Sequence, residues 1–101
     1  MKKLPNDVKP YRCTPEFTET TIPKGLLQNH MTKPGVWAVI HVLNGTLEYL
    51  ILEPVEERHT LMPGHPGIVE PVMKHHVRPL GPVRFYVEFQ TASGDAADPH
   101  A

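Results

Sequence analysis

Histidine is the residue type in this sequence best suited to chemistry near neutral pH. Seven histidines are scattered over 101 residues, and imidazole both binds metals and exchanges protons in this range. The best placed of them is His75, which follows a Pro63-Gly64 turn, a short strand and Pro71. The proline ring stiffens the bend that leads to the histidine. Because a site needs rigidly held side chains, His75 is the first candidate for a functional residue.

The strongest signal for secondary structure surrounds Asn44-Gly45. Residues 36–43 and 46–52 are rich in β-branched and aromatic side chains, and the dipeptide between them is typical of a two-residue type I′ turn. The sequence therefore predicts a hairpin in which these two runs pair with each other. Its inward face would consist of Ala38, Ile40, Val42, Leu47, Tyr49 and Ile51.

The opposite face of this hairpin is too apolar to be left to water alone. His41 and Glu48 face each other there and are expected to form a hydrogen-bonded pair. The apolar side chains around them are Trp37, Val39, Leu43, Leu50 and Leu52. We expect a further strand layer or a second subunit to cover this face, and we predict a homodimer.

The rest of the chain also favours short strands separated by turns. Twelve prolines and seven glycines leave no room for an ordinary helix. This pattern is typical of an all-β sandwich or barrel, formed here by a single domain over residues 1–91. The small, polar residues 92–101 are expected to form a disordered tail. Further strands are expected at 18–22, 26–31, 58–62, 68–70, 76–80 and 83–91, with a turn at Gly81-Pro82.

Composition argues against several classes of partner. Ten basic and eleven acidic residues give a net charge of -1, so a nucleic-acid footprint is not expected. No apolar run approaches the roughly 18 residues of a membrane span. The first residues lack the apolar segment of a secretory signal, and the single cysteine, Cys13, cannot form an internal disulfide. A cytoplasmic location is therefore expected.

The order of turn, strand, proline and histidine around His75 resembles the second sequence motif of the cupin superfamily. In that motif the histidine enters a β-barrel, and Pro63-Gly64, Pro71 and His75 match it in order. Residues 42–47, Val-Leu-Asn-Gly-Thr-Leu, match the end of the first cupin motif. The resemblance implies a small cupin-like jelly-roll barrel, also called a double-stranded β-helix.

The same resemblance implies a metal site with a reduced set of ligands. It aligns His30 with the first ligand of the first motif, whereas Thr32 and Ala38 stand where the family carries a second histidine and a glutamate. Glu88 is the most available third ligand beside His30 and His75, because two histidines and one carboxylate suit zinc, iron or manganese. The alternation of the last strand leaves the alternative that Glu88 is a solvated residue on the other face.

A narrower resemblance covers nearly the whole chain. Residues 11–17 (Tyr-Arg-Cys-Thr-Pro-Glu-Phe), 33–37 (Lys-Pro-Gly-Val-Trp) and 87–89 (Val-Glu-Phe) are similar to the cupin-like family of the tellurite-resistance protein TehB. In that family the domain occurs alone or in front of a methyltransferase. The resemblance implies a role in the response to tellurite or related oxyanions. The sequence has no glycine-rich loop for S-adenosylmethionine, so neither a nucleotide cofactor nor methyl transfer is expected.

We therefore expect a small binding protein that holds a divalent metal or a small anion in the mouth of the barrel. His30 and His75 would make the contacts to it. Two alternatives stay open. One is a metal-dependent oxygenase or isomerase that uses open positions on the metal, and the other is a non-catalytic, dimeric interaction module.

Overall fold

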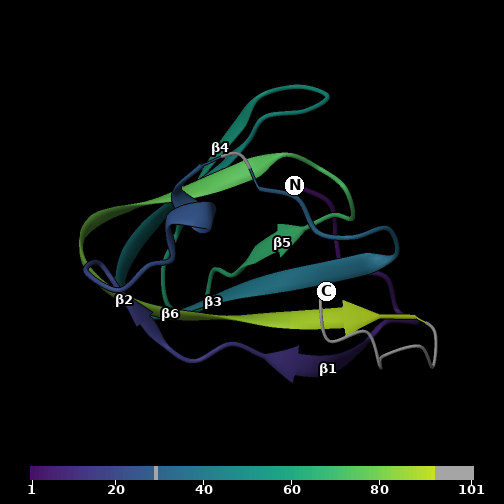
Figure 1. The fold of residues 1–101 in the computed structure, drawn as a ribbon, viewed down its shortest axis with the longest axis horizontal. Helices are drawn as coiled ribbons and strands as arrows, with labels where there is room; N and C mark the ends of the chain where they lie inside the picture. The colour runs from purple at the N-terminus through teal and green to yellow at the C-terminus, as the bar shows by residue number, and fades with distance from the viewer. Residues whose placement is uncertain (29, 93–101) are drawn as a thin grey trace.

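The computed structural model describes residues 1–28 and 30–92, and these form an almost entirely β-structure (Figure 1). The all-β character predicted from the sequence is confirmed, whereas the predicted tail at 93–101 lies outside the described residues. None of the helical structure in the described part is long and apolar enough to cross a membrane. The elements are β1 (Lys9–Cys13), β2 (Phe17–Thr18), the 3₁₀ helix η1 (Lys24–Leu27), β3 (Val36–Ile51), β4 (Glu57–Leu61), β5 (Gly67–Val69) and β6 (His75–Thr91).

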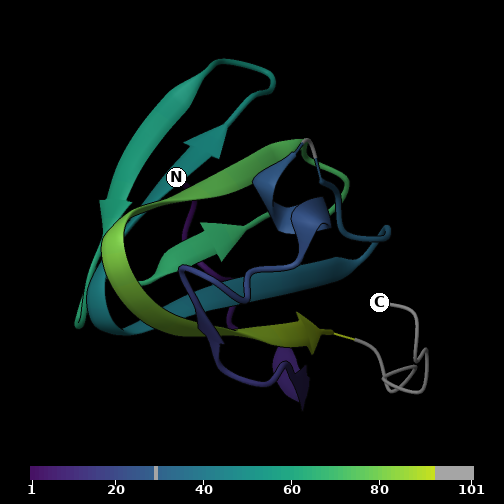
Figure 2. The same cartoon turned by 60° about the vertical axis from the view of Figure 1, so that its left-hand side comes forward.

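The two longest strands, β3 and β6, form an antiparallel ribbon that bends in its middle. Pairing runs from Val36 with Thr91 at one end to Ile51 with His75 at the other. Near the bend Gly45 pairs with Val83, and the register shifts between residues 42 and 44 and again between 45 and 47, as β-bulges do. Figure 2 shows the two strands curving together, so that the halves of the ribbon face each other.

The predicted hairpin at Asn44-Gly45 is wrong, because the chain continues through it as one strand of 16 residues. A type I′ turn needs positive φ at both central residues, whereas only Gly45 of the two has it, at 79°. A glycine at positive φ within a paired strand is instead typical of a β-bulge, in agreement with the register shifts on both sides of Gly45. Both predicted runs pair with β6 instead, so His41 lies opposite Tyr86 and not opposite Glu48.

The predicted inward face of β3 is nevertheless confirmed. Its six side chains are all at most 6% exposed. The inward side chains have even residue numbers up to Val42 and odd numbers from Leu47 onward, and the predicted hairpin turn would explain this change. The irregular backbone around Gly45 produces the same change, because one extra residue moves the alternation to the other parity. These side chains form the core together with those of β6, chiefly Val77, Val83, Phe85 and Val87.

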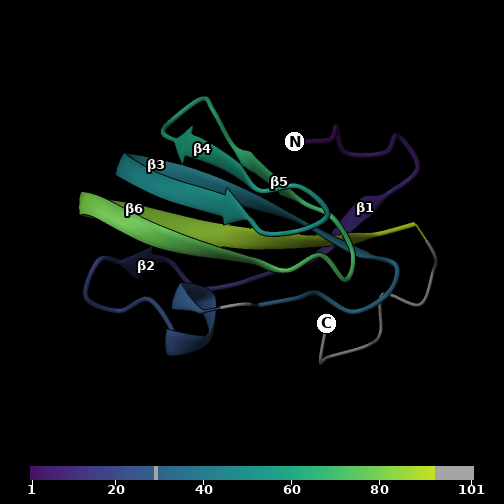
Figure 3. The ribbon, with the colours of Figure 1, turned by 90° about the horizontal axis from the view of Figure 1, so that it is seen from above.

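The sheet is not closed, so the predicted jelly-roll barrel is not confirmed. The strand order is β1-β6-β3-β4, with β2 paired to β6 and β5 paired to β3. This path has β1 at one end and β4 at the other, and β3 and β6 lie side by side at its centre (Figure 3). The architecture is a curled antiparallel sheet.

Local predictions outside the long ribbon had mixed outcomes. Of the predicted strand at 26–31, the described residues 26–28, 30 and 31 include none that lies in a strand, because η1 follows Pro23 and His30 forms an isolated bridge with His75. The predicted turn at Gly81-Pro82 is wrong, since β6 runs through it with Gly81 at φ 137°. The strands predicted at 58–62 and 68–70 agree with β4 and β5 to within one residue, and the edge strand predicted at 18–22 is limited to β2.

The outer face of the ribbon is covered in part by the N-terminal residues. Val39 on this face is 5% exposed, and it pairs with Ile68 of β5. The backbone N–H of Ile68 donates to the Met1 sulfur at 3.1 Å, and Lys2 lies 3.4 Å from the Glu70 carboxylate. The chain itself therefore supplies some of the expected cover, and the homodimer stays a prediction.

Candidate functional site

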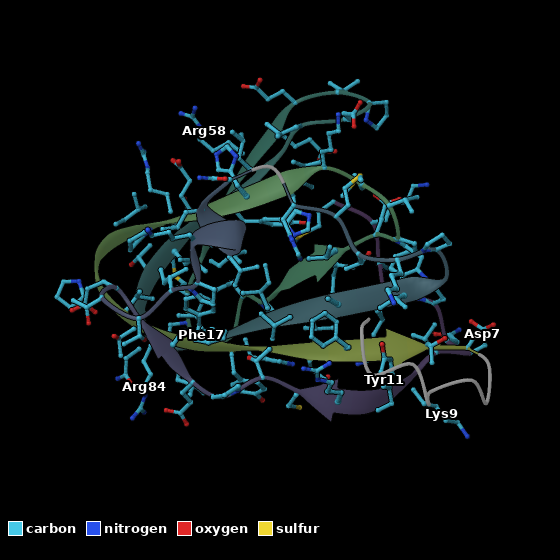
Figure 4. The ribbon with its side chains drawn as sticks, in the orientation of Figure 1. Asp7, Lys9, Tyr11, Phe17, Arg58 and Arg84 are labelled. Atoms are coloured by element: carbon cyan, nitrogen blue, oxygen red, sulfur yellow. The ribbon has the colours of Figure 1, made fainter. Side chains whose placement is uncertain are left out.

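A cavity of about 250 Å³ lies between the facing halves of the bent ribbon. Its walls are mainly apolar, and the segment that includes β2 and η1 closes one side of it. Phe17 of this segment, labelled in Figure 4, packs edge-on against Phe85 of β6 with ring centroids 5.6 Å apart. The residues with polar side chains that line the cavity are Arg12, Thr14, His30, Thr32 and His75.

The structure brings His30 and His75 together in this cavity. Their backbones form a two-way bridge, in which the N–H of His30 donates to the His75 carbonyl at 2.8 Å and the N–H of His75 to the His30 carbonyl at 3.0 Å. Their ring centroids are 5.4 Å apart at an interplanar angle of 80°. His75 is 4% exposed, whereas His30 is half-buried. The pair thus joins the segment before β3 to the first residue of β6.

A hydrogen bond determines which nitrogen of His75 can meet a ligand. The Nδ1 atom lies 3.0 Å from the Met73 carbonyl oxygen, and since a carbonyl only accepts, Nδ1 carries the proton. Burial lowers the pKa of His75; the Met73 carbonyl opposes this effect, and nearby His30 and His76 add to it. Burial also lowers the pKa of His30. The neutral ring of His75 therefore has an Nε2 lone pair that can accept a hydrogen bond or bind a metal.

The lowered pKa of His75 predicts that the protein loses stability as the pH falls below the ordinary histidine value of 6.5. In that range the unfolded chain binds a proton that the folded chain refuses, so the free energy of unfolding decreases until the folded-state pKa is passed. Urea unfolding at pH 7.5, 6.5 and 5.5 measures this effect. His75→Gln should flatten the dependence in part, because burial also lowers the pKa of His30, which contributes in the same direction. An unchanged slope in His75→Gln would contradict the assignment.

Glu88 is not brought to the histidine pair. It pairs with Val39 on the outer face of the ribbon, where its Oε1 atom lies 3.4 Å from His41 Nε2 and accepts a hydrogen bond from Gln90 at 2.8 Å. The predicted partner of His41, Glu48, instead binds the arginines of neighbouring strands, Arg58 at 3.7 Å and Arg78 at 3.1 Å. The position of Glu88 follows from strand alternation, which the sequence already offered as the alternative.

The donor set around the cavity does not complete a metal site. Over residues 1–28 and 30–92, no group of three or more His, Cys, Asp or Glu side chains is placed to hold an ion. The Thr32 hydroxyl is already engaged, since it donates to the Val36 carbonyl at 2.8 Å. Two imidazoles alone fall short of the three or four protein ligands of ordinary zinc centres. The described residues therefore do not fit the ligand set of a resident metal.

The positions that the cupin resemblance singled out nevertheless meet in one place. His30, Thr32, Ala38 and His75 all line the same cavity, although Thr32 and Ala38 replace a histidine and a glutamate. The structure therefore brings together the four positions that the resemblance implies as ligands, but Thr32 and Ala38 supply neither an imidazole nor a carboxylate.

Sequence reasoning missed Arg12 as a residue of this site. It lies on edge strand β1, pairs with Phe89 of β6, and has its guanidinium carbon 6.0 Å from the centroid of the Phe89 ring. The neighbouring Thr14 also lines the cavity, whereas Cys13 between them does not. The alternation along the chain, with Arg12 and Thr14 on one face and Cys13 on the other, was the sequence signal that could have identified Arg12. It could not be used because nothing in the sequence shows which strand β1 pairs with.

Comparisons with known proteins agree with this fold. A family model described as TehB-like domain matches residues 12–87. The crystal structure of TehB from Haemophilus influenzae aligns with a TM-score of 0.77 and 27% identity, covering 85% of this chain and 32% of that one. A crystal structure of a protein from Escherichia coli K12 aligns with a TM-score of 0.83 and 22% identity, covering 92% and 99% of the two chains, and shows the shared fold. No curated protein sequence matches the chain.

Proposed function

The chain belongs to the TehB-like domain family, and from that premise we propose that it binds a small anion in the cavity between the halves of its ribbon. The observation that carries this proposal is the presence of an arginine, the buried His75 and the half-buried His30 at one largely apolar cavity. A guanidinium offers several N–H donors in a planar fork that matches anionic oxygens. The proposed role is capture or sensing of the anion, without turnover.

The hydroxyl groups of Thr14 and Thr32, which also line the cavity, are hydrogen-bonded within the protein. We assign ligand recognition to Arg12, His30 and His75, because a guanidinium has five N–H donors and an imidazole has a donor and an acceptor nitrogen. The Thr14 hydroxyl donates to the Pro15 carbonyl at 2.8 Å and accepts from the Val87 N–H at 3.0 Å. Thr32 donates to a backbone carbonyl as described above. A ligand thus meets one cation and two imidazoles against apolar walls.

Calorimetric titration of the full chain with a set of anions tests this proposal. The set contains phosphate, sulfate, selenite, tellurite, acetate and benzoate. We expect at least one to bind, and Arg12→Gln to weaken it about tenfold or more, because a charge-assisted hydrogen bond is lost. Lys9→Gln is the matched control, since Lys9 is a cation on the same strand outside the cavity lining. Equal affinities for wild type and Arg12→Gln, or no binding of any anion, would contradict the proposal.

A second candidate function is capture of a divalent ion by the two histidines. The observation in its favour is the Nδ1 hydrogen bond to Met73, which leaves Nε2 of His75 as a lone-pair donor, as in many metal-ligating histidines. Zinc, iron or manganese would need its other donors from the small ligand or from water. Metal analysis of the purified protein, with His75→Ala for comparison, separates this candidate from anion binding.

The cellular role that we propose is a response to oxyanion stress in the cytoplasm. It is supported by the family membership and, for location, by the exposed free thiol of Cys13, which suits a reducing compartment. Growth in the presence of tellurite, with the wild-type chain or Arg12→Gln expressed at equal levels, tests it. Protection that requires Arg12 supports the role, and equal growth with both contradicts it.

A further inference from the structure

We infer that the anion is organic: a planar apolar body that carries a carboxylate at one end and a hydroxyl or N–H donor at the other. This inference rests on the proposed anion-binding function and specifies the class of ligand. Three features of the cavity carry it, namely the aromatic walls, the arginine at the exposed edge strand and the accepting nitrogen of a buried histidine.

The walls match an aromatic body. The sequence contains three phenylalanines, and all of them, Phe17, Phe85 and Phe89, line the cavity. Aromatic rings pack favourably edge-on or offset against one another, as Phe17 and Phe85 already do at an interplanar angle of 61°. A bare inorganic oxyanion could pair with Arg12, but it would gain nothing from contact with these apolar walls. The apolar surface is therefore better matched by a ligand that is itself mostly apolar.

The size of the cavity agrees with a single substituted ring. An apolar cavity of about 150 Å³ is enough to hold benzene, and this one has about 250 Å³. The difference leaves room for two small substituents. Larger ligands are disfavoured, because the cavity lies below the roughly 300 Å³ at which pockets for drug-sized molecules begin.

The polar groups assign an orientation to the ligand. Arg12 is exposed and His75 is buried, so the arginine marks the outer end of the cavity and the histidine the inner end. The guanidinium donates, and therefore selects a carboxylate. The neutral His75 ring accepts at Nε2, and therefore selects a donor. A carboxylate toward the mouth and a hydroxyl or N–H toward His75 satisfy both.

Calorimetry on the full chain with three matched probes tests the inference. The probes are 4-hydroxybenzoate, which has both groups, 4-methoxybenzoate, in which a methyl group replaces the donated proton, and phenol, which lacks only the carboxylate. We expect 4-hydroxybenzoate to bind most tightly and each of the others to bind about tenfold more weakly, because 4-methoxybenzoate offers no donor to Nε2 of the buried His75 and phenol lacks the charge-assisted hydrogen bond to Arg12. The comparison of ligands needs no variant, so it stands even if substitutions at the buried His75 impair folding.

Two variants connect the probes to the residues. Arg12→Gln should weaken both carboxylates and leave phenol unchanged, whereas His75→Leu should remove the advantage of 4-hydroxybenzoate over 4-methoxybenzoate. Equal or tighter binding of 4-methoxybenzoate would overturn the inference. If only inorganic oxyanions bind, and do so through Arg12, the inference fails while the proposed function stands. If no anion of either kind binds, both fail.

Discussion

Gly45→Ala is expected to destabilise the protein by more than about 4 kcal/mol, a value reached only when a substitution cannot be accommodated. A Cβ atom on Gly45 would lie 2.0 Å from the Pro82 carbonyl oxygen and 3.0 Å from the Val83 Cα. Both are backbone atoms of the neighbouring strand, so relief would require the ribbon to separate at its bend. Since small domains have about 5–15 kcal/mol of total stability, much of the fold would be lost.

Gly64→Ala is the matched control for this substitution. Gly64 has φ +86°, close to the +79° of Gly45, but a Cβ atom there would meet nothing within 4 Å. It should cost only the roughly 1–2 kcal/mol of a left-handed backbone at a residue with a side chain. Urea unfolding followed by circular dichroism measures both variants. Equal losses would show that the contact with Pro82 does not limit the bend.

Tyr49→Ala is expected to cost about 3–5 kcal/mol, as other large aromatic truncations in cores do. The Tyr49 side chain is fully buried, its hydroxyl donates to the Ile68 carbonyl at 2.9 Å, and its ring stands edge-on to His75 at 5.8 Å. The substitution therefore removes core volume, a tie to β5 and the support of the site histidine. Burial raises the pKa of Tyr49, so the hydroxyl keeps its proton and remains a donor.

Two further variants separate these contributions. Tyr49→Phe keeps the ring and should cost about 1–3 kcal/mol, since the Ile68 carbonyl loses its partner, with ligand affinity retained. Tyr86→Ala removes the same side chain from the outer face, where Tyr86 is half-buried and stacks on His41 with centroids 4.9 Å apart. It should cost clearly less than Tyr49→Ala. Similar unfolding free energies for the two alanine variants would contradict the assignment of Tyr49 to the core.

The comparison of β3 with its prediction shows that a hydrophobic pattern predicts which side chains are buried but not which strand pairs with which. Alternation identified all six inward side chains, because burial depends on which face a residue occupies and that face follows from a period of two. The same pattern was assigned to a hairpin, because Asn-Gly is favoured where the chain reverses. A reversal of the chain at Asn44-Gly45 and a β-bulge there would both shift the inward side chains from even to odd residue numbers. Only the partner strand distinguishes them, and for both halves of β3 that partner is β6, about forty residues away at Gly45.

The candidate site likewise contains residues that the sequence identified and one that only the structure revealed. Family resemblance located His30 and His75, which the structure brings within 5.4 Å of each other. Glu88 is on the other face of its strand, in agreement with the alternation that argued against it. Arg12 was missed because its side chain reaches the cavity only through the pairing of β1 with the end of β6. A residue on an edge strand has no recognisable role until its neighbour is known.

The sequence by itself determined the β class, the inward side chains of the longest strand and the two histidines that meet at the cavity, because each follows from local periodicity or from a motif. The tertiary structure decided the bend at Gly45, the open edges of the sheet and the approach of Arg12 to the cavity. These features depend on contacts between segments far apart in the chain. The free energy of such contacts arises only when both segments are in place, so no local pattern records them.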